Sequence, residues 1–477
     1  MMHQRLFLLL IAATLCASVA AAQPPNILFI LADDQRHDEL ACAGESFLQT
    51  PTLDRLAEQG VRFENMTVTT SICMVSRATI FTGLMQRSHG FAPGNANSRP
   101  VSPGDEKLCF PNLLRQAGYR TGYYGKNHVT FKSGTKKAFS RMFDDWAHIH
   151  RHPFFKEMPD GSKRHCDEII GDRSVAFVQS QPEDQPFFLY MSFNIAHAED
   201  SDLRPGIGHF PWPKAEDGMY EDITPPQPHL NAPAVFDALP EFLKTSENRS
   251  RFHWRWDTAE KYDVNMRARY RMLTGMDRII QRVLDTLEER GMAENTIVIF
   301  TADNGYYRGE RGLAGKWTHF EESLRVPLII YDPRRPAEQG GALIQQPTLN
   351  LDLPSTILDY AGVEIPTTYQ GQSMVSLLAG DAPQAWRTET FHEHHQHRDI
   401  IPKWSGIRGD RYVYACYDLQ NPPYEFFHDL KRDPDQLVNF ATDPEYASLL
   451  KQFREKNEAA IRAYGREQPT KESPATK

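Results

Sequence analysis

Short, predominantly apolar runs are the feature that most constrains how this chain can fold. Residues 26–31 (NILFIL), 187–193 and 296–300 are of this kind. Such runs are typical of strands that are buried on both faces of a parallel sheet. Helix patterns lie between them, and in the longest, residues 265–290, apolar side chains recur at spacings of three and four. The alternation predicts an α/β fold with a doubly wound, mostly parallel sheet flanked by helices.

Polar residues follow these three runs and a fourth strand-like segment, residues 119–124, at the point where each strand ends. Open α/β sheets place their sites beyond the carboxyl ends of their strands. We therefore expect the polar residues that follow these strands to converge on one edge of the sheet. They are Asp33, Asp34, Lys126, His128, His197, Asp303 and Asn304.

The segment of residues 71–83 (SICMVSRATIFTG) reads as the start of a helix with Cys73 at its N-terminus and Arg77 one turn later. Free N–H groups and the helix dipole at such a position lower a thiol pKa and attract anions. Cys73 is therefore a candidate reactive residue aimed at an anionic group. The alternative is a buried core cysteine, which is the usual fate of an isolated one.

The sequence changes character after about residue 380. Residues 407–418 alternate like one exposed antiparallel strand, residues 424–430 could pair with it, and residues 445–463 form an amphipathic helix. We predict a catalytic α/β domain over residues 23–380 and a smaller α+β subdomain with an antiparallel sheet over residues 381–477. Residues 198–262 are rich in Pro, Trp and charge and read as an elaborated loop region.

Residues 1–22 have the charge, the short apolar core and the A-x-A end of a secretory signal peptide. The apolar run is too short to span a membrane, and no other span is expected. We expect a periplasmic or secreted protein. After cleavage five cysteines remain, an odd number, so at least one has no intramolecular partner in an oxidising compartment. The pairing of Cys42, Cys109, Cys166 and Cys416 stays open.

The net charge of −9 argues against a nucleic-acid partner, because binding to phosphate backbones needs a basic surface. Among the strand-end residues, Asp33, Asp34, Asp303 and Asn304 offer only oxygen ligands. Three carboxylates gathered together need a counter-ion, and an all-oxygen set suits Ca²⁺, with Mg²⁺ as second choice. The alternative for each pair alone is a helix cap or a turn.

Cationic residues complete the candidate site. Arg77, Lys126, His128 and Lys316 could neutralise a tetrahedral oxyanion, and His197 could act as a general acid. The alternatives are solvated surface charges for the lysines and an ordinary loop histidine for His197.

With these motifs in place, the chain resembles the type I sulfatases of the alkaline-phosphatase-like superfamily. The likeness runs from residue 26 to about residue 439, and its motifs occur in the family's order. They are NILFILADDQ, TPTLDRLAEQGVRF, CMVSRATIFTG, GYYGKNHV, SFNIAHA, NTIVIFTADNG, GERGLAGKWTHFEESLRVPLI and DLKRDPDQLVNFA.

The resemblance implies hydrolysis of sulfate esters by a formylglycine made from Cys73, whose hydrate is the nucleophile. A formylglycine-generating or radical maturation enzyme would carry out that conversion. The ion would lie beside residue 73, held by Asp33, Asp34, Asp303 and Asn304. By the same carry-over, Arg77 and His128 position the formylglycine, Lys126 and Lys316 hold the sulfate oxygens, and His197 protonates the leaving alcohol.

One residue departs from the family's modification motif, which is usually Cys-X-Pro-X-Arg or Cys-X-Ala-X-Arg. Val75 occupies the Pro or Ala position here. A maturation enzyme reads this stretch while it is extended, so a β-branched residue could reduce conversion. Without conversion the chain would be a non-catalytic protein that binds sulfated glycans. A phosphodiesterase or phosphonate hydrolase on the same scaffold is the other alternative.

The expected substrate is a sulfated carbohydrate or polysaccharide. Residues 248–257 interleave Arg251 and Arg255 with aromatic side chains such as Trp254, a pattern suited to stacking on sugars while pairing with their anionic groups. His392 and His394 at the start of the smaller subdomain are further candidates for substrate contact. Packing of the aromatics against the large domain and a solvated histidine loop are the alternatives.

Overall fold

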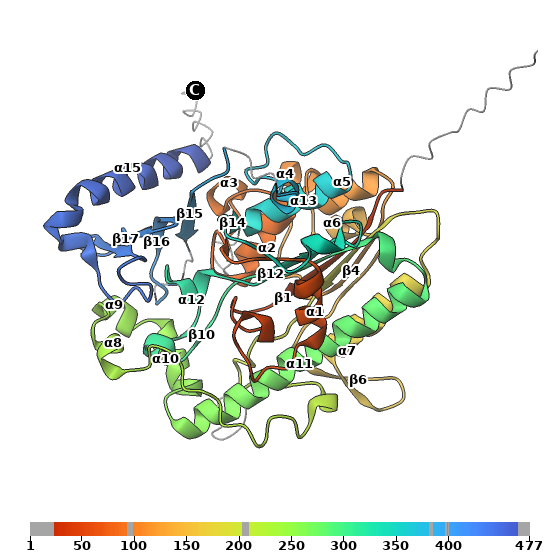
Figure 1. The fold of residues 1–477 in the computed structure, drawn as a ribbon, viewed down its shortest axis with the longest axis horizontal. Coiled ribbons are helices and arrows are strands. Elements are labelled where there is room, and N and C mark those ends of the chain that lie inside the picture. The colour runs from red at the N-terminus through yellow and green to blue at the C-terminus, as the bar shows by residue number, and fades with distance from the viewer. Residues whose placement is uncertain are drawn as a thin grey trace, which may run out of the picture.

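The computed structural model describes residues 23–92, 99–202, 209–380, 385–395, 398 and 400–465. An eight-stranded sheet forms the centre of the molecule, with the strand order β13-β2-β12-β9-β1-β8-β4-β5 (Figure 1). From one edge to the other the strands are β13 (Ala342–Ile344), β2 (Val61–Phe63), β12 (Leu328–Tyr331), β9 (Thr296–Ala302), β1 (Asn26–Ala32), β8 (Phe187–Ser192), β4 (Arg120–Gly125) and β5 (Asp145–His148).

The five strands β9, β1, β8, β4 and β5 run parallel to one another. β12 is antiparallel to both of its neighbours, and β13 pairs with β2 in parallel. The prediction of a mostly parallel sheet is confirmed. Register pairs Leu31 of β1 with Ser192 of β8 and Thr301 of β9, so these strands end level with one another.

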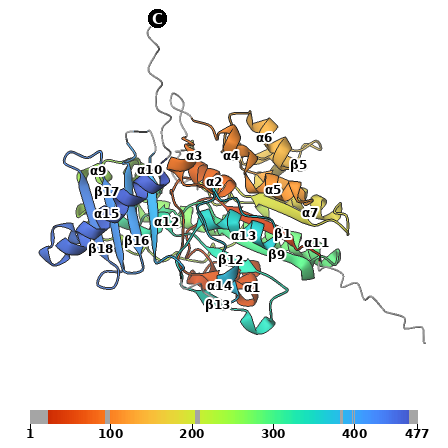
Figure 2. The same cartoon turned by 90° about the horizontal axis from the view of Figure 1, so that it is seen from above.

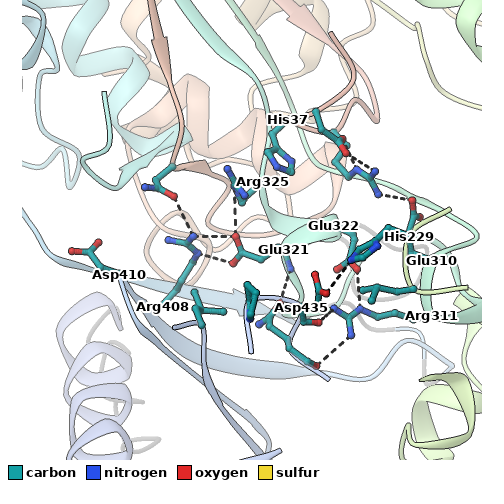
Figure 3. Close-up of a pocket in the computed structure, with 17 residues that line it drawn as sticks. His37, His229, Glu310, Arg311, Glu321, Glu322, Arg325, Arg408, Asp410 and Asp435 are labelled. Atoms are coloured by element: carbon teal, nitrogen blue, oxygen red, sulfur yellow. Dashed lines mark hydrogen bonds and ion pairs between the residues drawn. The ribbon is translucent and has the colours of Figure 1, made fainter. Parts of the chain in front are cut away.

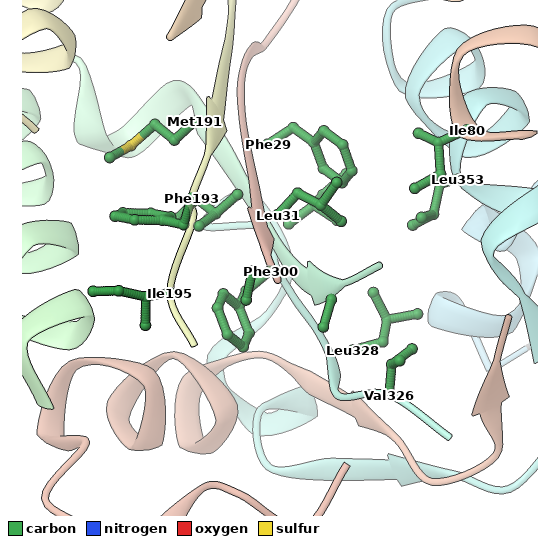
Figure 4. Packing of buried hydrophobic residues seen from close by; sticks show 14 of the residues in the cluster. Phe29, Leu31, Ile80, Met191, Phe193, Ile195, Phe300, Val326, Leu328 and Leu353 are labelled. Carbon is green, nitrogen blue, oxygen red and sulfur yellow. The ribbon is translucent and has the colours of Figure 1, made fainter. Parts of the chain in front are cut away.

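Helices cover both faces of this sheet (Figures 1 and 2). One layer contains α1 (Pro51–Gln59), α7 (Cys166–Gln179) and α11 (Ala259–Glu289), and the other contains α2 (Cys73–Thr82), α5 (Phe110–Gln116), α6 (Thr135–Met142) and α13 (Leu353–Tyr360). Figure 4 shows the apolar packing that joins these layers, with Phe29 and Leu31 of β1 between Met191 of β8 and Ile80 of α2. Burial of such side chains is the main term that stabilises the fold.

A second sheet of four antiparallel strands lies beside the first and is crossed by α15 (Ala447–Tyr464) (Figure 2). Its strands are β15 (Glu389–His394), β16 (Trp404–Gly409), β17 (Tyr412–Tyr417) and β18 (Tyr424–Asp429). A separate apolar cluster, including Phe391, Ile407 and Phe453, fills the space under α15.

The prediction of one exposed strand over residues 407–418 was wrong. The chain turns at Asp410 and Arg411, which separate β16 from β17, and the two strands pair as a hairpin. Most of their residues are buried, because one face of the small sheet packs under α15 and the other against the catalytic domain. The predicted pairing of residues 424–430 with this region is confirmed by β18.

The expected loop region of residues 198–262 contains helices that its composition concealed. They are α8 (Pro233–Asp237), α9 (Glu241–Lys244), α10 (Glu247–Arg255) and the first residues of α11. The remaining helices are α3 (Gln86–His89), α4 (Pro103–Lys107), α12 (Glu321–Leu324) and α14 (Val375–Leu378). The short strand pairs are β3 (Met66–Thr67) with β14 (Thr348–Leu349), β6 (Phe155–Glu157) with β7 (Lys163–His165), and β10 (Tyr307–Arg308) with β11 (Ala314–Gly315).

The proposed signal peptide lies outside the described residues. Within the part of the chain that is described, no helix is long and apolar enough to cross a membrane. All five cysteines of the described chain are free thiols, and Cys73, Cys109 and Cys166 are buried.

Candidate active site

The carboxyl ends of the parallel strands bring the strand-end residues together. Asp33 follows β1, Lys126 follows β4, Asp303 follows β9, and His197 lies five residues beyond β8. Asp33 donates its N–H to the Ile195 carbonyl at 2.7 Å, which ties the β1 and β8 loops to each other. The convergence that the sequence predicted is therefore present.

The carboxylates form a compact cluster. The backbone N–H of Asp34 donates to Asp303 Oδ1 at 3.2 Å, and Asn304 Nδ2 donates to Asp34 Oδ1 at 2.7 Å. One ligand atom each from Asp33, Cys73 and Asp303 lies within 4.8 Å of the other two. Gly305 permits this turn to sit close to α12, because a Cβ there would lie 2.4 Å from the Glu322 carbonyl oxygen. The cluster is thus fixed by its own hydrogen bonds and by backbone packing.

Two oxygens of this cluster have no hydrogen-bond partner in the described part of the chain. They are Asp33 Oδ1 and Asn304 Oδ1, and both residues are fully buried. An unsatisfied buried acceptor costs free energy, so such atoms indicate a missing partner. Carboxylate and amide oxygens are the ligands that Ca²⁺ and Mg²⁺ prefer. The residues present fit a hard divalent cation.

Three buried cations balance the three carboxylates. Lys126 Nζ pairs with Asp33 and Lys316 Nζ pairs with Asp34, while Arg77 Nε donates to Asp303 Oδ2 at 2.7 Å. The formal charge of these six side chains is zero. A divalent cation would bring it to plus two, a charge that favours the binding of an anion such as sulfate.

Burial and charge shift the pKa values within this cluster. Burial and the neighbouring Asp303 carboxylate raise the pKa of Asp33 to about 7, against the effect of Lys126. For Asp34, burial would also raise the pKa, but Lys316 and Lys126 lower it below its usual value. Burial opposes the charge of Lys316 too, yet the Asp34 carboxylate keeps its pKa above the ordinary lysine value. Lys316 therefore stays protonated at neutral pH.

Arg77 connects three strand ends. Besides its pairing with Asp303, its Nη1 donates to the Lys126 carbonyl at 2.9 Å and also to Ser192 Oγ at the end of β8. Its Nη2 has no partner in the described chain. Although burial alone would lower it, the carboxylates of Asp303 and Asp33 raise the pKa of Arg77 above its usual value. The guanidinium is a fixed positive charge with one donor left for a ligand.

Cys73 is the first residue of α2, as the sequence predicted, and its side chain is 6% exposed. The Sγ atom lies 3.6 Å from His128 Nδ1. Burial, with Lys126 and Arg77 nearby, lowers the pKa of His128 well below its usual value, so its imidazole is neutral. Val75 is buried on α2 and packs in the main core. Its apolar side chain is thus accommodated by the folded protein.

His197 lies near Asp34 Oδ2, whereas Lys316 pairs with Oδ1 of the same carboxylate. His197 Nδ1 donates to the Ala198 carbonyl at 2.7 Å, and its Nε2 lies 3.7 Å from Asp34 Oδ2. Burial, together with Arg151, Lys316 and Lys126, holds the pKa of His197 well below its usual value. The free ring nitrogen of a neutral His197 therefore faces the cluster.

Arg269 of α11 is a residue that sequence reasoning missed. Its guanidinium donates to the Asp34 carbonyl, to the Ala196 carbonyl at 2.9 Å, and to both carboxylate oxygens of Glu39. Arg269 thereby holds the backbone of the Asp34 loop and of the His197 loop. Its only signal in the sequence is an arginine on the apolar side of a long helix, a position where an unpaired charge would be unfavourable.

The predicted substrate residues of α10 gather around one carboxylate. Arg251 Nη1 donates to Asp200 Oδ2 at 3.0 Å, and Arg255 pairs with Asp200 Oδ1. The Arg251 guanidinium lies 4.9 Å from the centre of the Trp317 ring and 5.6 Å from that of Trp254. Trp317 follows Lys316 in the chain, so Arg251 lies next to the candidate site and Trp254 lies next to Arg251, whereas Arg255 is fully buried.

His392 and His394 lie on β15 and are both buried. Each ring nitrogen of His392 is hydrogen-bonded within the protein, Nδ1 to the Val68 carbonyl at 2.9 Å and Nε2 with Thr390 Oγ1 at 2.8 Å. Neither ring nitrogen of His394 has a partner in the described residues. Of the two, His394 alone has ring nitrogens left for a ligand. Substrate contact by either histidine stays a prediction.

Comparison with protein families gives two matches. The family described as "Sulfatase" matches residues 25–363, and the family described as "N-sulphoglucosamine sulphohydrolase, C-terminal" matches residues 309–463. The first match alone covers more than half of the chain.

Two curated relatives are similar to this chain over nearly their whole length. An N-acetylglucosamine-6-O-sulfatase of Bacteroides thetaiotaomicron is 27% identical, with 96% of this chain and 90% of that protein covered. The N-sulphoglucosamine sulphohydrolase of Homo sapiens is 28% identical, with 93% and 91% covered.

Solved structures show the same architecture. A structure in complex with its substrate D-glucosamine-2-N,6-O-disulfate superposes with a TM-score of 0.76 at 25% identity, covering 94% of this chain and 100% of that one. The phosphonate monoester hydrolase of Agrobacterium radiobacter superposes with a TM-score of 0.72 at 21% identity, covering 93% and 96%, which shows the fold alone.

Proposed function

The chain belongs to the sulfatase family, and from this we propose that it hydrolyses sulfate esters of a sulfated carbohydrate with a formylglycine at position 73 and a divalent cation. The observation that carries the proposal is the buried cluster at the strand ends, where three carboxylates and three cations surround Cys73. Two acceptors in this cluster and one donor of Arg77 have no partner in the described chain. A set of charges with open hydrogen-bonding positions is suited to bind an ion and an anion together.

We assign the cation to Asp33, Asp34, Asp303 and Asn304, with Ca²⁺ preferred over Mg²⁺ because Ca²⁺ accepts irregular all-oxygen coordination, whereas Mg²⁺ demands near-ideal octahedral geometry. When bound, such an ion supplies Lewis-acid stabilisation of negative charge on sulfate oxygens. Lys126 and Lys316 now pair with Asp33 and Asp34. With the cation in place, these ammonium groups would be released to hold the oxygens of the sulfate.

A formylglycine hydrate at position 73 would supply the oxygen nucleophile. Residue 73 begins α2, so the helix N-terminus adds a favourable potential for the negative charge that develops there. His128 Nδ1 lies 3.6 Å from the Cys73 sulfur, within reach of a hydroxyl on the same side chain. Neutral His128 can accept a hydrogen bond from that hydroxyl and orient it, while Arg77 fixes the surrounding backbone.

His197 would manage the proton of the leaving alcohol. Its Nδ1–H is anchored on Ala198, so Nε2 is the atom that can exchange a proton. In the free protein the pKa of His197 is lowered and the ring is neutral. Binding of a sulfate anion beside it raises that pKa, because a nearby negative charge favours imidazolium. His197 can then pass the proton to the ester oxygen as the sulfur–oxygen bond breaks.

The substrate class is proposed from the relatives. Two of them are named for sulfatase activity on glucosamine derivatives, and one similar structure is a complex with its substrate, a disulfated glucosamine. In this chain Arg251, with the rings of Trp254 and Trp317 close to it, offers a charged and aromatic border to the site. We propose a sulfated amino sugar, met outside the cytoplasm after secretion by the N-terminal segment.

Two measurements test the proposal. Protein from the native host should hydrolyse 4-nitrophenyl sulfate and N-acetylglucosamine 6-sulfate faster than 4-nitrophenyl phosphate or phenylphosphonate esters. A higher rate on the phosphorus esters would favour the phosphonate hydrolase alternative. Mass spectrometry of the peptide that contains Cys73 should show formylglycine, which is also the test of Val75. A thiol alone, with no sulfate released from either ester, would contradict the proposal and leave sulfoglycan binding.

A further inference from the structure

A cavity of about 220 Å³ lies beside α3, apart from the catalytic cluster. It is lined by Gln86, Arg87, Gly90, Phe91, Ala92, Arg99 and His395. None of these residues belongs to the set that surrounds Cys73. The cavity contains two guanidinium groups and no carboxylate among its lining residues, in a chain whose net charge is −9.

The two arginines of this cavity differ in their surroundings. Arg87 Nε donates to Glu393 Oε2 at 2.7 Å, and the Glu393 carboxylate beneath it is fully buried. Arg99 is exposed, and its side chain makes no ion pair or hydrogen bond with any residue that the structure describes. Among the described residues, the Arg99 charge therefore has no counter-ion at the cavity.

Polar atoms suited to sugar hydroxyls accompany this charge. Gln86 is 5% exposed, and its Oε1 has no hydrogen-bond partner among the described residues. His395 Nε2 lies 3.0 Å from both Arg87 Nη2 and Glu393 Oε2. Only one of these two contacts can be a hydrogen bond in either tautomer, because a single ring nitrogen either donates or accepts. A ligand in the cavity can donate a hydrogen bond to Gln86 Oε1 and can accept one from Arg87 when His395 is bonded to Glu393.

Two chain segments connect the cavity to the catalytic residues. Val101, two residues after Arg99, donates to the Thr130 carbonyl at 2.9 Å, and Thr130 is two residues after His128. Glu393, two residues before His395, donates to the Thr69 carbonyl at 2.9 Å, and Thr69 is four residues before Cys73. Two residues span at most about 7 Å. Two such spans and the hydrogen-bonded pair between them place Arg99 within roughly 20 Å of His128, a distance that an oligosaccharide bound at residue 73 can cover.

The larger pocket in Figure 3 does not suit this role. Its volume is about 390 Å³, but its lining includes six carboxylates and four arginines. Each of those arginines is already paired with a carboxylate, for example Arg311 with Glu322 at 2.9 Å and Arg408 with Glu321 at 2.7 Å. A net negative lining repels sulfate and carboxylate groups.

We propose that the cavity at Gln86, Arg87, Arg99 and His395 is an anion subsite for a second acidic group of the substrate, a sulfate or a carboxylate on a neighbouring sugar. This inference rests on the proposed function, because it places the scissile sulfate at residue 73. It predicts that the protein prefers acidic oligosaccharides over monosaccharide sulfates. Arg99 supplies the positive charge, and Gln86 Oε1 accepts a hydrogen bond from a hydroxyl of the same sugar.

Binding of a defined tetrasaccharide of alternating hexuronate and 6-O-sulfated glucosamine tests the subsite. The Cys73→Ala variant would be used so that the probe is not consumed, and Kd measured by isothermal titration calorimetry. Adding Arg99→Gln should raise the Kd for the tetrasaccharide about five- to tenfold, as expected for one charge-assisted contact near the surface. The Kd for N-acetylglucosamine 6-sulfate should not change. An equal Kd for the tetrasaccharide with and without Arg99 would overturn the subsite.

Matched variants separate this result from general electrostatics. Arg173 is exposed on α7, and its side chain makes no hydrogen bond or ion pair among the described residues, so Arg173→Gln removes the same charge elsewhere and should leave Kd unchanged. Arg99→Lys should restore part of the affinity. A Kd that rises equally in Arg173→Gln would show a non-specific charge effect and contradict the proposal. Carboxyl reduction of the tetrasaccharide identifies whether carboxylate or sulfate is the bound group.

Failure of the proposed function would be seen separately. Turnover of 4-nitrophenyl sulfate by the protein with Cys73 intact reports on the catalytic cluster and should be the same in Arg99→Gln. A protein that releases no sulfate from any ester contradicts the proposed function, while the Kd comparison still decides whether Arg99 binds an acidic glycan.

Discussion

Two charged regions of this protein lie on opposite sides of α12 and differ in the side chains that pair with their carboxylates, two lysines and one arginine in the first and arginines alone in the second. In the catalytic cluster, Lys126, Lys316 and Arg77 meet three carboxylates, and acceptor oxygens of Asp33 and Asn304 have no partner in the described chain. In the pocket of Figure 3, every lining arginine is paired with a carboxylate. α12 separates the two, since the Ser323 carbonyl accepts from Gly305 N–H at 3.0 Å and Glu322 of the same helix lines the pocket.

This difference separates charged side chains that can bind a ligand from charged side chains that stabilise the fold. Arginine forms planar, often bidentate pairs that satisfy a carboxylate within the protein, as Arg408 does with both oxygens of Glu321. Lysine is a point charge that can leave one carboxylate oxygen open for an ion. We therefore expect activity to depend on the lysines of the catalytic cluster and on its oxygens that lack a partner in the described chain, and stability to depend on the arginine–carboxylate pairs of the pocket.

Removal of divalent cations should have the largest effect. Dialysis against EDTA should lower sulfatase activity by at least about 10³-fold, because a cation contributes more stabilisation than a single hydrogen-bond donor. Addition of Ca²⁺ should restore activity and raise the melting temperature, since an ion that binds only the folded state stabilises it. Full activity in EDTA, with no change of melting temperature on adding Ca²⁺, would refute the assignment of the cation.

The Lys316→Met variant should lower kcat/KM for 4-nitrophenyl sulfate on the order of 10²- to 10³-fold, the usual loss for one donor to a developing oxyanion. The melting temperature in the presence of Ca²⁺ should change little, because the ion compensates Asp34. Arg408→Met in the pocket is the matched control, and it should keep most of the activity of the folded protein. Retention of more than a tenth of the activity by Lys316→Met would argue against its role.

The Arg311→Met variant should act on stability. It leaves the Glu322 carboxylate buried and unpaired, which costs about 3–5 kcal/mol of unfolding free energy. Urea denaturation measures this loss. The double variant Arg311→Met, Glu322→Leu should recover much of it, because both charges are then absent. No loss in the single variant would show that the pair does not support the pocket.

The smallest effect is expected for the pH dependence of His37, which lines the pocket. Burial, with the Arg325 and Arg36 guanidinium groups, lowers the pKa of His37 to about 3. The unfolded chain binds a proton near pH 6.5 and the folded one does not, so stability is full above pH 6.5 and is lost as pH falls towards 3. Between pH 7 and pH 5 the unfolding free energy of His37→Asn should fall by on the order of 1 kcal/mol less than that of the wild type. Equal losses in denaturation curves would contradict this.

Much of the fold was predictable because its strands are buried on both faces. β1, β8 and β9 read as apolar runs, and their common direction placed Asp33, His197 and Asp303 at one edge. The hairpin of β16 and β17 was not predicted, because two strands with one alternating pattern look continuous unless the turn at Asp410 is recognised. Helix α10 was missed since its charged and aromatic residues lack a clear apolar stripe.

Parts of the site could not be predicted because they depend on contacts between distant segments. Arg269 and Asp34 are joined only when α11 packs against the β1 loop, and Asp200 binds both Arg251 and Arg255 only after α10 folds. Nothing local in the sequence indicates that His392 is fully hydrogen-bonded whereas both ring nitrogens of its neighbour His394 lack partners among the described residues.

The sequence by itself determined the sheet, the residues at its carboxyl edge and the chemistry they can perform. A short stretch of sequence is enough to indicate a buried strand and the side chains that follow it. Only the tertiary structure decided which charges pair with one another and which oxygens, such as Asp33 Oδ1 and Asn304 Oδ1, are left without a partner among the described residues. That distinction depends on distances between side chains far apart in the chain. It separates a pocket of paired arginines from a cluster with room for a cation and a sulfate.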